Sequence, residues 1–357
     1  MTRPTCVVVL AAGEGTRMRS ARPKPLHKLC GRTMASFVLE AARHDEVRAT
    51  VVVVGHHATW VEKELAEGAG VRLTFVEQGE TLGTGHAVAV ALASVDEAIG
   101  ESDGDVVILP GDTPLLRRET VARLLEEHRA SGAALTVMSA VVPDPRGYGR
   151  MVTGRDGRLE RIVEERDASR AERLIDEVNT GVMVVRQSLL GPALRRVGRQ
   201  NAQGEYYLTD VVAVLSAMGH ATRSFVLEDP SEALGVNDRA QLARAEAELR
   251  RRINEHWMGR GVTLWDPATT YLDVDVVLAP DVSILPGTIL QGRTRVGAGA
   301  TVGPRAHLVD VEVGERSRVA TVEASAVRIG ADATVRSFVT LGPGEDVAAG
   351  ALVAPRG

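Results

Sequence analysis

The C-terminal part of the chain repeats with a period of six residues. Beyond Gly261 the sequence is rich in Val, Gly, Ala, Pro and Thr. Its aliphatic residues recur at Leu278, Ile284, Leu290, Val296, Val302 and Leu308 and, after irregular spacing, at Ile329, Val335, Leu341, Val347 and Val353. A period of six with small residues between is the hexapeptide pattern of a parallel β-helix, in which each hexad forms one face of a coil. A β-sandwich would show a period of two and would not hold a six-residue phase. The pattern therefore predicts a parallel β-helix.

The N-terminal part alternates apolar, β-branched runs with helical patterns. Buried strands are predicted at 6–10, 50–54, 73–76 and 106–109, and helices at 35–43, 59–67, 85–94 and 118–130. This alternation is typical of βαβ units around a mainly parallel sheet. Such sheets bind ligands beyond the carboxyl ends of their strands, where the loops after Leu10 and Leu109 lie. We therefore expect a Rossmann-like α/β domain with its site at that edge.

A charged amphipathic stretch separates the two patterns. The 357 residues favour two domains. Between them, residues 237–258 form a helical pattern that opens with the capping pair Asn237-Asp238 and closes at Gly259. The predicted organisation is an α/β domain over 1–236, a linker helix over 237–260 and a β-helix over 261–357.

Composition excludes several classes of partner. Hydrophobic residues make up 44% and charged residues 25% of the chain, as in ordinary globular proteins. The net charge of -5 argues against nucleic-acid binding, and no apolar run approaches the ~20 residues that cross a bilayer. The N-terminus enters a strand without a signal-like segment. We expect a cytoplasmic protein with neither membrane nor nucleic-acid partners.

The loop Leu10-Ala-Ala-Gly-Glu-Gly-Thr-Arg-Met18 follows the first predicted strand directly. It resembles a dinucleotide fingerprint but lacks the third glycine, since Met18 follows Gly13 and Gly15, and no acidic ribose partner is well placed. Glycines let backbone N–H groups approach a phosphate where a Cβ would block the way. The loop therefore indicates phosphate binding rather than a hydride cofactor.

Two charged residues support that interpretation. Lys24 lies between Pro23 and Pro25 in a chain whose basic residues are otherwise nearly all Arg. A compact ammonium suits a single phosphate oxygen better than a planar guanidinium does, although a solvated loop lysine is the plain alternative. Asp112 follows the strand 106–109 and a glycine, a good position for a Mg²⁺ ligand or for a turn-forming aspartate.

A series of motifs then occurs in order along the chain. They are Leu10-Ala-Ala-Gly-x-Gly-Thr-Arg-Met18 with Pro23-Lys24, Leu82-Gly-Thr-Gly-His-Ala87, Gly111-Asp112, Gly147-Tyr-Gly-Arg150, Ile162-Val-Glu164, Asn179-Thr-Gly181, Gln203-Gly-Glu-Tyr-Tyr-Leu-Thr-Asp210 and Gly235-Val-Asn237. Together they resemble the bacterial bifunctional N-acetylglucosamine-1-phosphate uridylyltransferase/glucosamine-1-phosphate acetyltransferase family, densely over residues 5–258 and more loosely over the repeats. The glycine loop is shared by all sugar nucleotidyltransferases, whereas the combination is more specific.

The resemblance implies a nucleotide site. Arg17 and Lys24 would be its catalytic residues. Gln78 would read the uracil by amide hydrogen bonds, and His86 in the same region is interpreted as structural or near the base rather than as a general base. The nucleotide-binding set would be Leu10, Ala11, Ala12, Gly13, Lys24, Gln78, Leu82, Gly83 and Thr84.

The resemblance also implies a sugar site and a metal site. Gly149, Glu164 and Asn179 would bind the sugar and its acetamido group. Asp112 and Asn237 would ligate Mg²⁺, and Asn237 also reads as a helix cap. The implied left-handed β-helix is of a kind that usually forms homotrimers through its flat faces.

These residues predict Mg²⁺-dependent transfer from UTP to N-acetylglucosamine 1-phosphate, giving UDP-N-acetylglucosamine, a cell-wall precursor, and pyrophosphate. The sugar phosphate would attack the α-phosphate in line, with positioning and charge neutralisation as the catalytic effects. The alternatives are a nucleotidyltransferase that uses dTTP or GTP or another hexose, and a non-catalytic regulatory relative.

The acetyltransferase activity of the family is predicted to be absent. The sequence reaches Gly357 before the motifs that would carry it, with no Lys after Lys63, no Tyr after Tyr271 and no His after His307. Gly342 also stands where the family has Arg before Pro-Gly. The repeats are therefore expected to act as a scaffold, unless they transfer acyl groups through a different site.

Overall fold

The computed structural model describes residues 3–66, 73–100 and 103–355, which fall into two compact units. One unit spans Met1–His27 and Thr33–Leu242, and the other spans Lys28–Arg32 and Ala243–Gly357. The division lies within helix α7 (Arg239–Met258). Across the described ranges, the helices are too short or too polar to cross a membrane.

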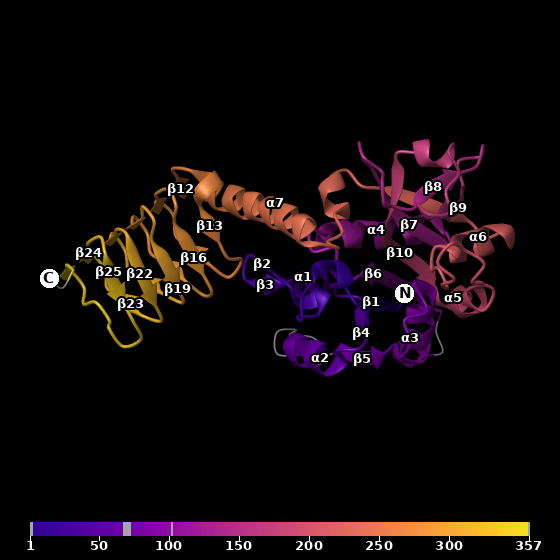
Figure 1. Ribbon diagram of the computed structural model, residues 1–357, viewed down its shortest axis with the longest axis horizontal. Coiled ribbons are helices and arrows are strands. Elements are labelled where there is room, and N and C mark those ends of the chain that lie inside the picture. The colour runs from indigo at the N-terminus through magenta and orange to yellow at the C-terminus, as the bar shows by residue number, and fades with distance from the viewer. Residues whose placement is uncertain (1–2, 67–72, 101–102, 356–357) are drawn as a thin grey trace. The chain divides into compact units, whose positions relative to one another are not determined.

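A nine-stranded sheet forms the centre of the first unit (Figure 1). Its strands are β1 (Thr5–Ala11), β4 (Val47–Val54), β5 (Leu73–Glu77), β6 (Asp105–Pro110), β7 (Leu135–Val141), β8 (Arg150–Thr153), β9 (Leu159–Val163), β10 (Glu177–Arg186) and β11 (Thr222–Val226). The main path runs β11-β7-β10-β6-β1-β4-β5, with β8 and β9 attached beside β10. The pairs of this path are parallel except the two that β10 makes with β6 and β7.

Helices cover both faces of this sheet. They are α1 (Met34–Ala41), α2 (Ala58–Ala66), α3 (Thr84–Ile99), α4 (Arg118–Ser131), α5 (Gln187–Leu194) and α6 (Asp210–Ala217). Alternate side chains of β1 enter two different cores: Cys6 and Val8 pack with α3, α5 and α6, whereas Val7 and Val9 pack with α1, α2 and α4. The apolar part of this strand, residues 6–11, is thus packed on both faces, and the predicted Rossmann-like fold is confirmed.

The four predicted strands and four predicted helices all form, with shifted ends. The helix predicted at 85–94 continues to Ile99, because Val95 and Ile99 extend the buried stripe of Val88 and Ala91. The predicted end of another helix at residue 67 lies outside the described residues. The strands β7 to β11 of this unit have no counterpart among the predicted strands, and the antiparallel β10 among them depends on pairing with strands distant in sequence.

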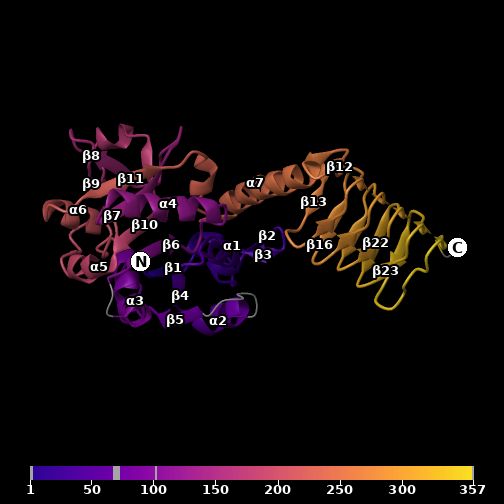
Figure 2. The same cartoon turned by 180° about the vertical axis from the view of Figure 1, so that it is seen from behind.

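The second unit contains the parallel β-helix (Figures 1 and 2). One sheet stacks β12 (Thr263–Leu264), β15 (Ser283–Ile284), β18 (Thr301–Val302), β21 (Arg318–Val319), β24 (Thr334–Val335) and β26 (Leu352–Val353). The second stacks β13 (Tyr271–Leu272), β16 (Ile289–Gln291), β19 (His307–Val309), β22 (Val322–Ser325) and β25 (Val339–Leu341). The third stacks β14 (Val277–Leu278), β17 (Arg295–Val296), β20 (Glu312–Val313) and β23 (Arg328–Ile329). The predicted left-handed β-helix is confirmed.

The irregular spacing between Leu308 and Ile329 does not interrupt the β-helix. Val313, Val319 and Ala324 take the inward positions of the three faces there, and all are buried. Several turns are one residue shorter in this region. Paired residues such as Ser283 and Thr301 are 18 apart in sequence before it, whereas Glu312 and Arg328 are 16 apart within it, and the strands stay in register. A search for a strict six-residue period misses these coils, because each shortened turn shifts the inward positions that follow by one residue.

Stacked glycines bring successive coils into close contact. A Cβ built on Gly314 would lie 2.4 Å from the backbone nitrogen of Ala331, and one on Gly330 would lie 2.4 Å from that of Ala349. At Gly342, in contrast, the nearest atom to a Cβ would be Glu345 Oε2 at 3.8 Å. Backbone atoms cannot move aside independently, so only the first two positions demand glycine for reasons of space.

We therefore predict that Gly314→Ala destabilises the protein by about 1–3 kcal/mol, the usual cost of overpacking. The matched variant Gly342→Ala should leave the free energy of unfolding within about 0.5 kcal/mol of the wild type. Chemical denaturation followed by circular dichroism measures both. Equal stability of the two variants would contradict the stacking argument.

Candidate active site

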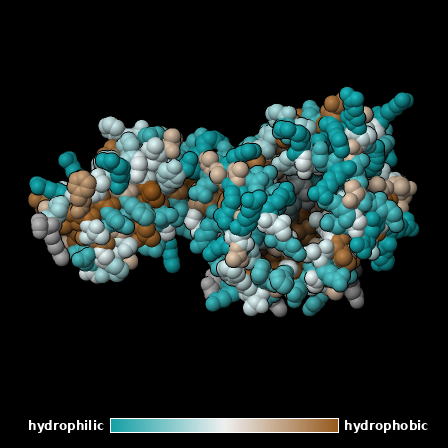
Figure 3. All heavy atoms as spheres, viewed as in Figure 1, coloured by the Kyte–Doolittle hydropathy of each residue, from teal (hydrophilic) through white to brown (hydrophobic). Residues whose placement is uncertain are grey.

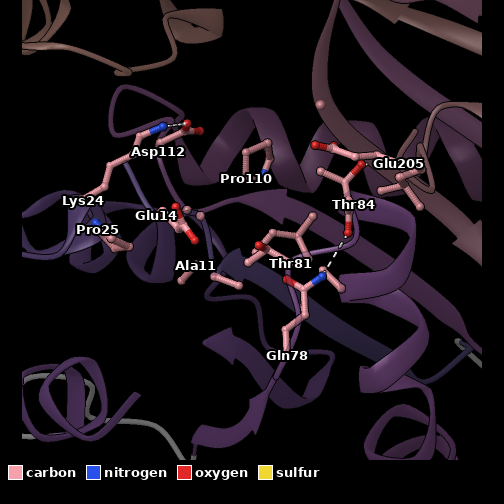
Figure 4. A pocket seen from close by; sticks show the side chains of 18 of the residues that line it. Ala11, Glu14, Lys24, Pro25, Gln78, Thr81, Thr84, Pro110, Asp112 and Glu205 are labelled. Atoms are coloured by element: carbon pink, nitrogen blue, oxygen red, sulfur yellow. Dashed lines mark hydrogen bonds and ion pairs between the residues drawn. The ribbon is translucent and has the colours of Figure 1, made fainter. Parts of the chain in front are cut away.

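A cavity of about 470 Å³ lies at the carboxyl ends of β1 and β6, within the first unit. Figure 3 shows a hollow on this unit rimmed by hydrophilic side chains, and Figure 4 shows the cavity from close by. Its lining is Leu10, Ala11, Ala12, Gly13, Glu14, Lys24, Pro25, Gln78, Thr81, Gly83, Thr84, Ala87, Pro110, Gly111, Asp112, Glu164, Asn179, Gly181, Met183, Glu205, Leu208 and Thr209. The cavity lies at the edge of the sheet that the sequence predicted.

The glycine loop borders this cavity. A Cβ on Gly13 would meet no atom within 4 Å, so packing within the chain does not require a glycine there. Gly15 differs: its φ of +63° is left-handed, and a Cβ would lie 2.5 Å from Cβ of Lys24. The short helix η1 (Thr16–Met18) then buries Met18. The loop thus leaves open backbone beside the cavity at Gly13 and packs against Lys24 at Gly15.

Lys24 is the centre of a polar cluster. Its Nζ donates to Asp112 Oδ2 at 2.5 Å and to Asn237 Oδ1 at 2.8 Å. Arg17 also donates to Asn237 Oδ1, at 3.0 Å. Lys24 lies on helix η2 (Lys24–Leu26), and the side chain is only 12% exposed. The structure therefore brings together the two predicted catalytic cations and the two predicted metal ligands.

The structure separates the two functions proposed for Asn237. The backbone N–H of Gln241 donates to Asp238 Oδ1 at 2.8 Å, so the side chain of Asp238 caps the start of α7. The backbone N–H of Asn237 donates to Gln241 Oε1 at 2.7 Å, while its side chain turns toward Lys24 and Arg17. A hydrogen bond of 2.9 Å from Val236 N to Asp112 O holds this segment beside β6. The interpretation of Asn237 as the helix cap is therefore wrong.

The donor set fits a magnesium ion. Asp112 Oδ2 and Asn237 Oδ1 lie within hydrogen-bonding distance of one atom, Lys24 Nζ, so both oxygens can approach one cation. Mg²⁺ is commonly held by one or two protein oxygens together with substrate phosphates and waters. Groups of three or more His, Cys, Asp and Glu that could hold a metal ion are absent from the described part of the chain.

The predicted base-reading residues lie at the other end of the cavity (Figure 4). Gln78 is buried, and its Nε2 donates to the Gly83 carbonyl at 3.0 Å. The backbone of Tyr206 clamps the 82–85 turn, donating to Leu82 O and accepting from Gly85 N, both at 2.8 Å. Gly83 has a φ of +108°, and a Cβ there would lie 2.6 Å from Tyr206 O. Only glycine fits at that close approach.

The predicted sugar-binding residues also form one group. Asn179 N donates to Gly149 O at 2.8 Å, and a Cβ on Gly149 would lie 3.5 Å from Glu164 Oε2. Asn179 Oδ1 accepts from Gly181 N at 2.9 Å, which orients the amide. Thr209 Oγ1 donates to Glu164 Oε1 at 3.0 Å. Burial raises the pKa of the Glu164 carboxyl, and Asp210 and Asp167 raise it further, although the Thr209 hydrogen bond opposes them.

Most of the predicted residues line the cavity, and two of the other four, Gly149 and Asn237, contact residues that do. Arg17, Leu82, Gly149 and Asn237 are outside the lining set. Arg17 donates to Asn237, and Asn237 accepts from Lys24. Leu82 accepts from Tyr206, and Gly149 accepts from Asn179.

The sequence analysis missed several lining residues. Glu14, Thr81, Glu205, Leu208 and Thr209 had been given no role, although all line the cavity. Part of the signal was present, because the motif over 203–210 had been noted without any function being assigned to its residues. This motif contacts the 82–85 turn that borders the cavity, because Leu208 N donates to Thr84 Oγ1 at 3.1 Å.

Comparison with known proteins identifies related families. Residues 7–198 match the family model of the MobA-like NTP transferase domain. The protein named bifunctional protein GlmU from Streptomyces avermitilis is 47% identical over 352 residues, which cover 98% of this chain and 72% of that protein. Proteins of the same name from Thermobifida fusca and Trichlorobacter lovleyi are 46% and 44% identical, covering 92% and 95% of this chain and 68% and 71% of theirs.

Two adjacent glutamates, Glu164 and Glu165, test how the surroundings of the predicted sugar-binding residues change a carboxyl pKa. Because burial raises the pKa of Glu164, its ionised form destabilises the folded state at pH values above that folded pKa. Glu164→Gln should therefore raise the midpoint of thermal unfolding at neutral pH. The gain should disappear as the pH falls through the window between the raised folded pKa and the ordinary carboxyl pKa, because the wild-type carboxyl is then protonated as well.

Glu165 provides the matched control. Its partial burial is outweighed by hydrogen bonds from Arg150 and Gly147 N, which lower the pKa of this carboxyl. Glu165→Gln should accordingly lower the midpoint at neutral pH, where the ionised carboxylate stabilises the fold. Thermal unfolding of both variants at acidic and neutral pH checks the two signs. A neutral-pH midpoint of Glu164→Gln below that of the wild type would contradict the argument.

Proposed function

Because this chain belongs to the GlmU family and carries a nucleotidyltransferase domain, we propose that it transfers the uridylyl group of UTP to N-acetylglucosamine 1-phosphate. The products would be UDP-N-acetylglucosamine and pyrophosphate. The observation that carries the proposal is the convergence of Lys24, Arg17, Asp112 and Asn237 at one end of a cavity whose other end holds Gln78. The cations Lys24 and Arg17 would bind the triphosphate, and the amide of Gln78 would bind the base.

Lys24 supplies a positioned positive charge. An ammonium has three N–H donors, and in the structure two of them are directed at Asp112 and Asn237. The third is available to a phosphate oxygen. Arg17 adds a second cation, which donates to the same Asn237 oxygen as Lys24 and whose guanidinium can donate to more than one oxygen. Together they would neutralise the negative charge that spreads over the α-phosphate and the leaving pyrophosphate.

Asp112 and Asn237 would hold a magnesium ion through their side-chain oxygens. When bound, such an ion supplies charge neutralisation to the phosphates. The open backbone at Gly13 lets the triphosphate lie close to the loop, since no Cβ occupies that space.

Glu164, Asn179 and Thr209 would orient the sugar so that its phosphate oxygen attacks in line. Positioning of this kind accounts for a large part of the rate, and no covalent residue is needed.

Nucleotide and sugar specificity separate this proposal from its alternatives. Pyrophosphate release is measured for UTP, dTTP, GTP and CTP, each paired with N-acetylglucosamine 1-phosphate, glucosamine 1-phosphate and glucose 1-phosphate. We expect the highest kcat/KM for UTP with N-acetylglucosamine 1-phosphate, complete loss on chelation of divalent metal, and recovery with Mg²⁺. A preference for another pair would indicate a different sugar nucleotidyltransferase, and a folded but inactive protein would indicate a regulatory relative.

The second activity implied by the relatives' name is proposed to be absent from residues 262–357, which lack Lys and contain His only at position 307. Acetyl-CoA consumption with glucosamine 1-phosphate, followed in the same panel, would contradict this. We also propose a homotrimer associating through the flat sheets of the β-helix. The molar mass from sedimentation equilibrium tests it.

Removing either end of the Lys24–Asp112 ion pair should strongly reduce turnover without unfolding the protein. Lys24→Ala is expected to lower kcat/KM by about 10²–10³-fold, the range for a lost charge stabiliser, and Asp112→Ala by about as much. Lys63→Ala and Asp45→Ala are the matched controls, because both side chains are exposed and lie outside the cavity. Activity retained in Asp112→Ala would remove Asp112 from the metal site.

A further inference from the structure

The amide of Gln78 has a second neighbour, His86. The Nε2 atom of Gln78 lies 3.0 Å from the carbonyl oxygen of Gly83 and 3.2 Å from Nδ1 of His86. Gln78 is 3% exposed, and its backbone N–H donates to Val54 O at 2.8 Å, so the residue is anchored at the end of β4. His86 lies in the first turn of α3, three residues after Gly83. One turn of chain therefore provides both partners of the amide nitrogen.

These contacts determine which way the amide faces. A carbonyl oxygen can only accept, so the atom of Gln78 that faces Gly83 O must be Nε2. The other N–H of the same nitrogen is available to His86 Nδ1, provided that Nδ1 carries a lone pair. The ring proton of the neutral imidazole must then lie on Nε2 of His86. Under these constraints Oε1 of Gln78 lies on the opposite side of the amide, as the dashed line from the nitrogen in Figure 4 illustrates.

A fixed acceptor at that position discriminates between pyrimidines. Uracil and thymine carry a proton on the ring nitrogen N3, which an amide oxygen can accept. Cytosine carries a lone pair on N3, which would face that oxygen without a proton between them. Sites that leave a buried polar group unpaired reject the wrong ligand strongly. The orientation of one amide would therefore decide the class of base.

We propose that His86 is a positioning residue that holds the Gln78 amide in this orientation and so makes the cavity select a pyrimidine with an N3 proton over cytosine. The inference rests on the proposed nucleotide function of the cavity. His86 is not required to touch the nucleotide or to transfer a proton. Its effect passes through Gln78, and it should therefore act on base selectivity rather than on the chemistry at the phosphates.

Two substitutions at one position test the proposal. His86→Leu removes the acceptor, whereas His86→Asn can place an amide oxygen where Nδ1 lies and so preserve it. The full chain is titrated with UTP and with CTP by calorimetry, at a pH above the usual imidazole range, and pyrophosphate release is measured with both. We expect His86→Leu to lower the UTP-to-CTP ratio of affinities about tenfold, the size of one lost hydrogen bond, and His86→Asn to keep the wild-type ratio.

The KM for UTP, compared with the KM for the sugar phosphate and with the midpoint of thermal unfolding, separates positioning from a general loss of structure. In His86→Leu the KM for UTP should rise, while the KM for the sugar phosphate and the midpoint of thermal unfolding stay close to wild type. An unchanged UTP-to-CTP ratio in a folded His86→Leu protein would overturn the proposal. So would a wild-type protein that binds CTP as tightly as UTP, or one that binds neither. A wild-type protein that binds UTP selectively but releases no pyrophosphate contradicts the proposed function alone.

A measurement on the wild type reports the tautomer of His86 directly. The ¹⁵N chemical shifts of the imidazole distinguish a proton on Nε2 from one on Nδ1, and the signal is assigned by its absence from the His86→Asn spectrum. The proposal requires the proton on Nε2. A proton on Nδ1 would direct a donor at the Gln78 nitrogen and overturn it.

Discussion

The burial of β1 on both faces is the constraint on which the active-site unit depends. Val7, Val8 and Val9 are at most 1% exposed, and β4 and β6 pair with both edges of the strand. A strand enclosed on every side can carry no polar chemistry along its length. Thr5 lies at the opposite end of the strand, so toward the cavity polar side chains begin only after Ala11, where the chain leaves the sheet. The glycine loop begins there, and the parallel neighbours β4 and β6 end at the same edge.

The register between β1 and β6 determines where Asp112 lies. Leu10 is opposite Pro110, and the next residue of the β6 chain, Gly111, donates its N–H to Leu10 O at 2.8 Å. A Cβ on Gly111 would lie 2.7 Å from that oxygen, so the turn that presents Asp112 needs a glycine. The carboxylate then meets Lys24, whose own stem packs against Gly15. The ion pair is thus assembled by backbone geometry, and the ammonium of Lys24 also donates to Asn237 Oδ1.

The polar cluster and the base-reading group are supported in different ways. The cluster joins side chains of residues 213 apart in sequence, Lys24 and Asn237, through direct hydrogen bonds. The base-reading group relies on backbone contacts, because Tyr206 and Leu208 hold the 82–85 turn against Gln78. Substitutions in the first are expected to change chemistry at the phosphates, and substitutions in the second to change selectivity. The motif over 203–210 belongs to the second group, and through Thr209 it also reaches Glu164.

Local periodicity in the sequence was sufficient to predict the α/β pattern and the β-helix, because each depends on which residues a strand or helix must bury. The antiparallel β10 and the shortened coils between Leu308 and Ile329 were not predictable in this way, since they depend on pairing between distant segments. The resemblance between motifs named most of the site residues but left Asn237 with two interpretations. Only the tertiary structure assigned the helix cap to Asp238 and turned Asn237 toward Lys24, because a side-chain hydrogen bond depends on distances in space that no sequence period encodes.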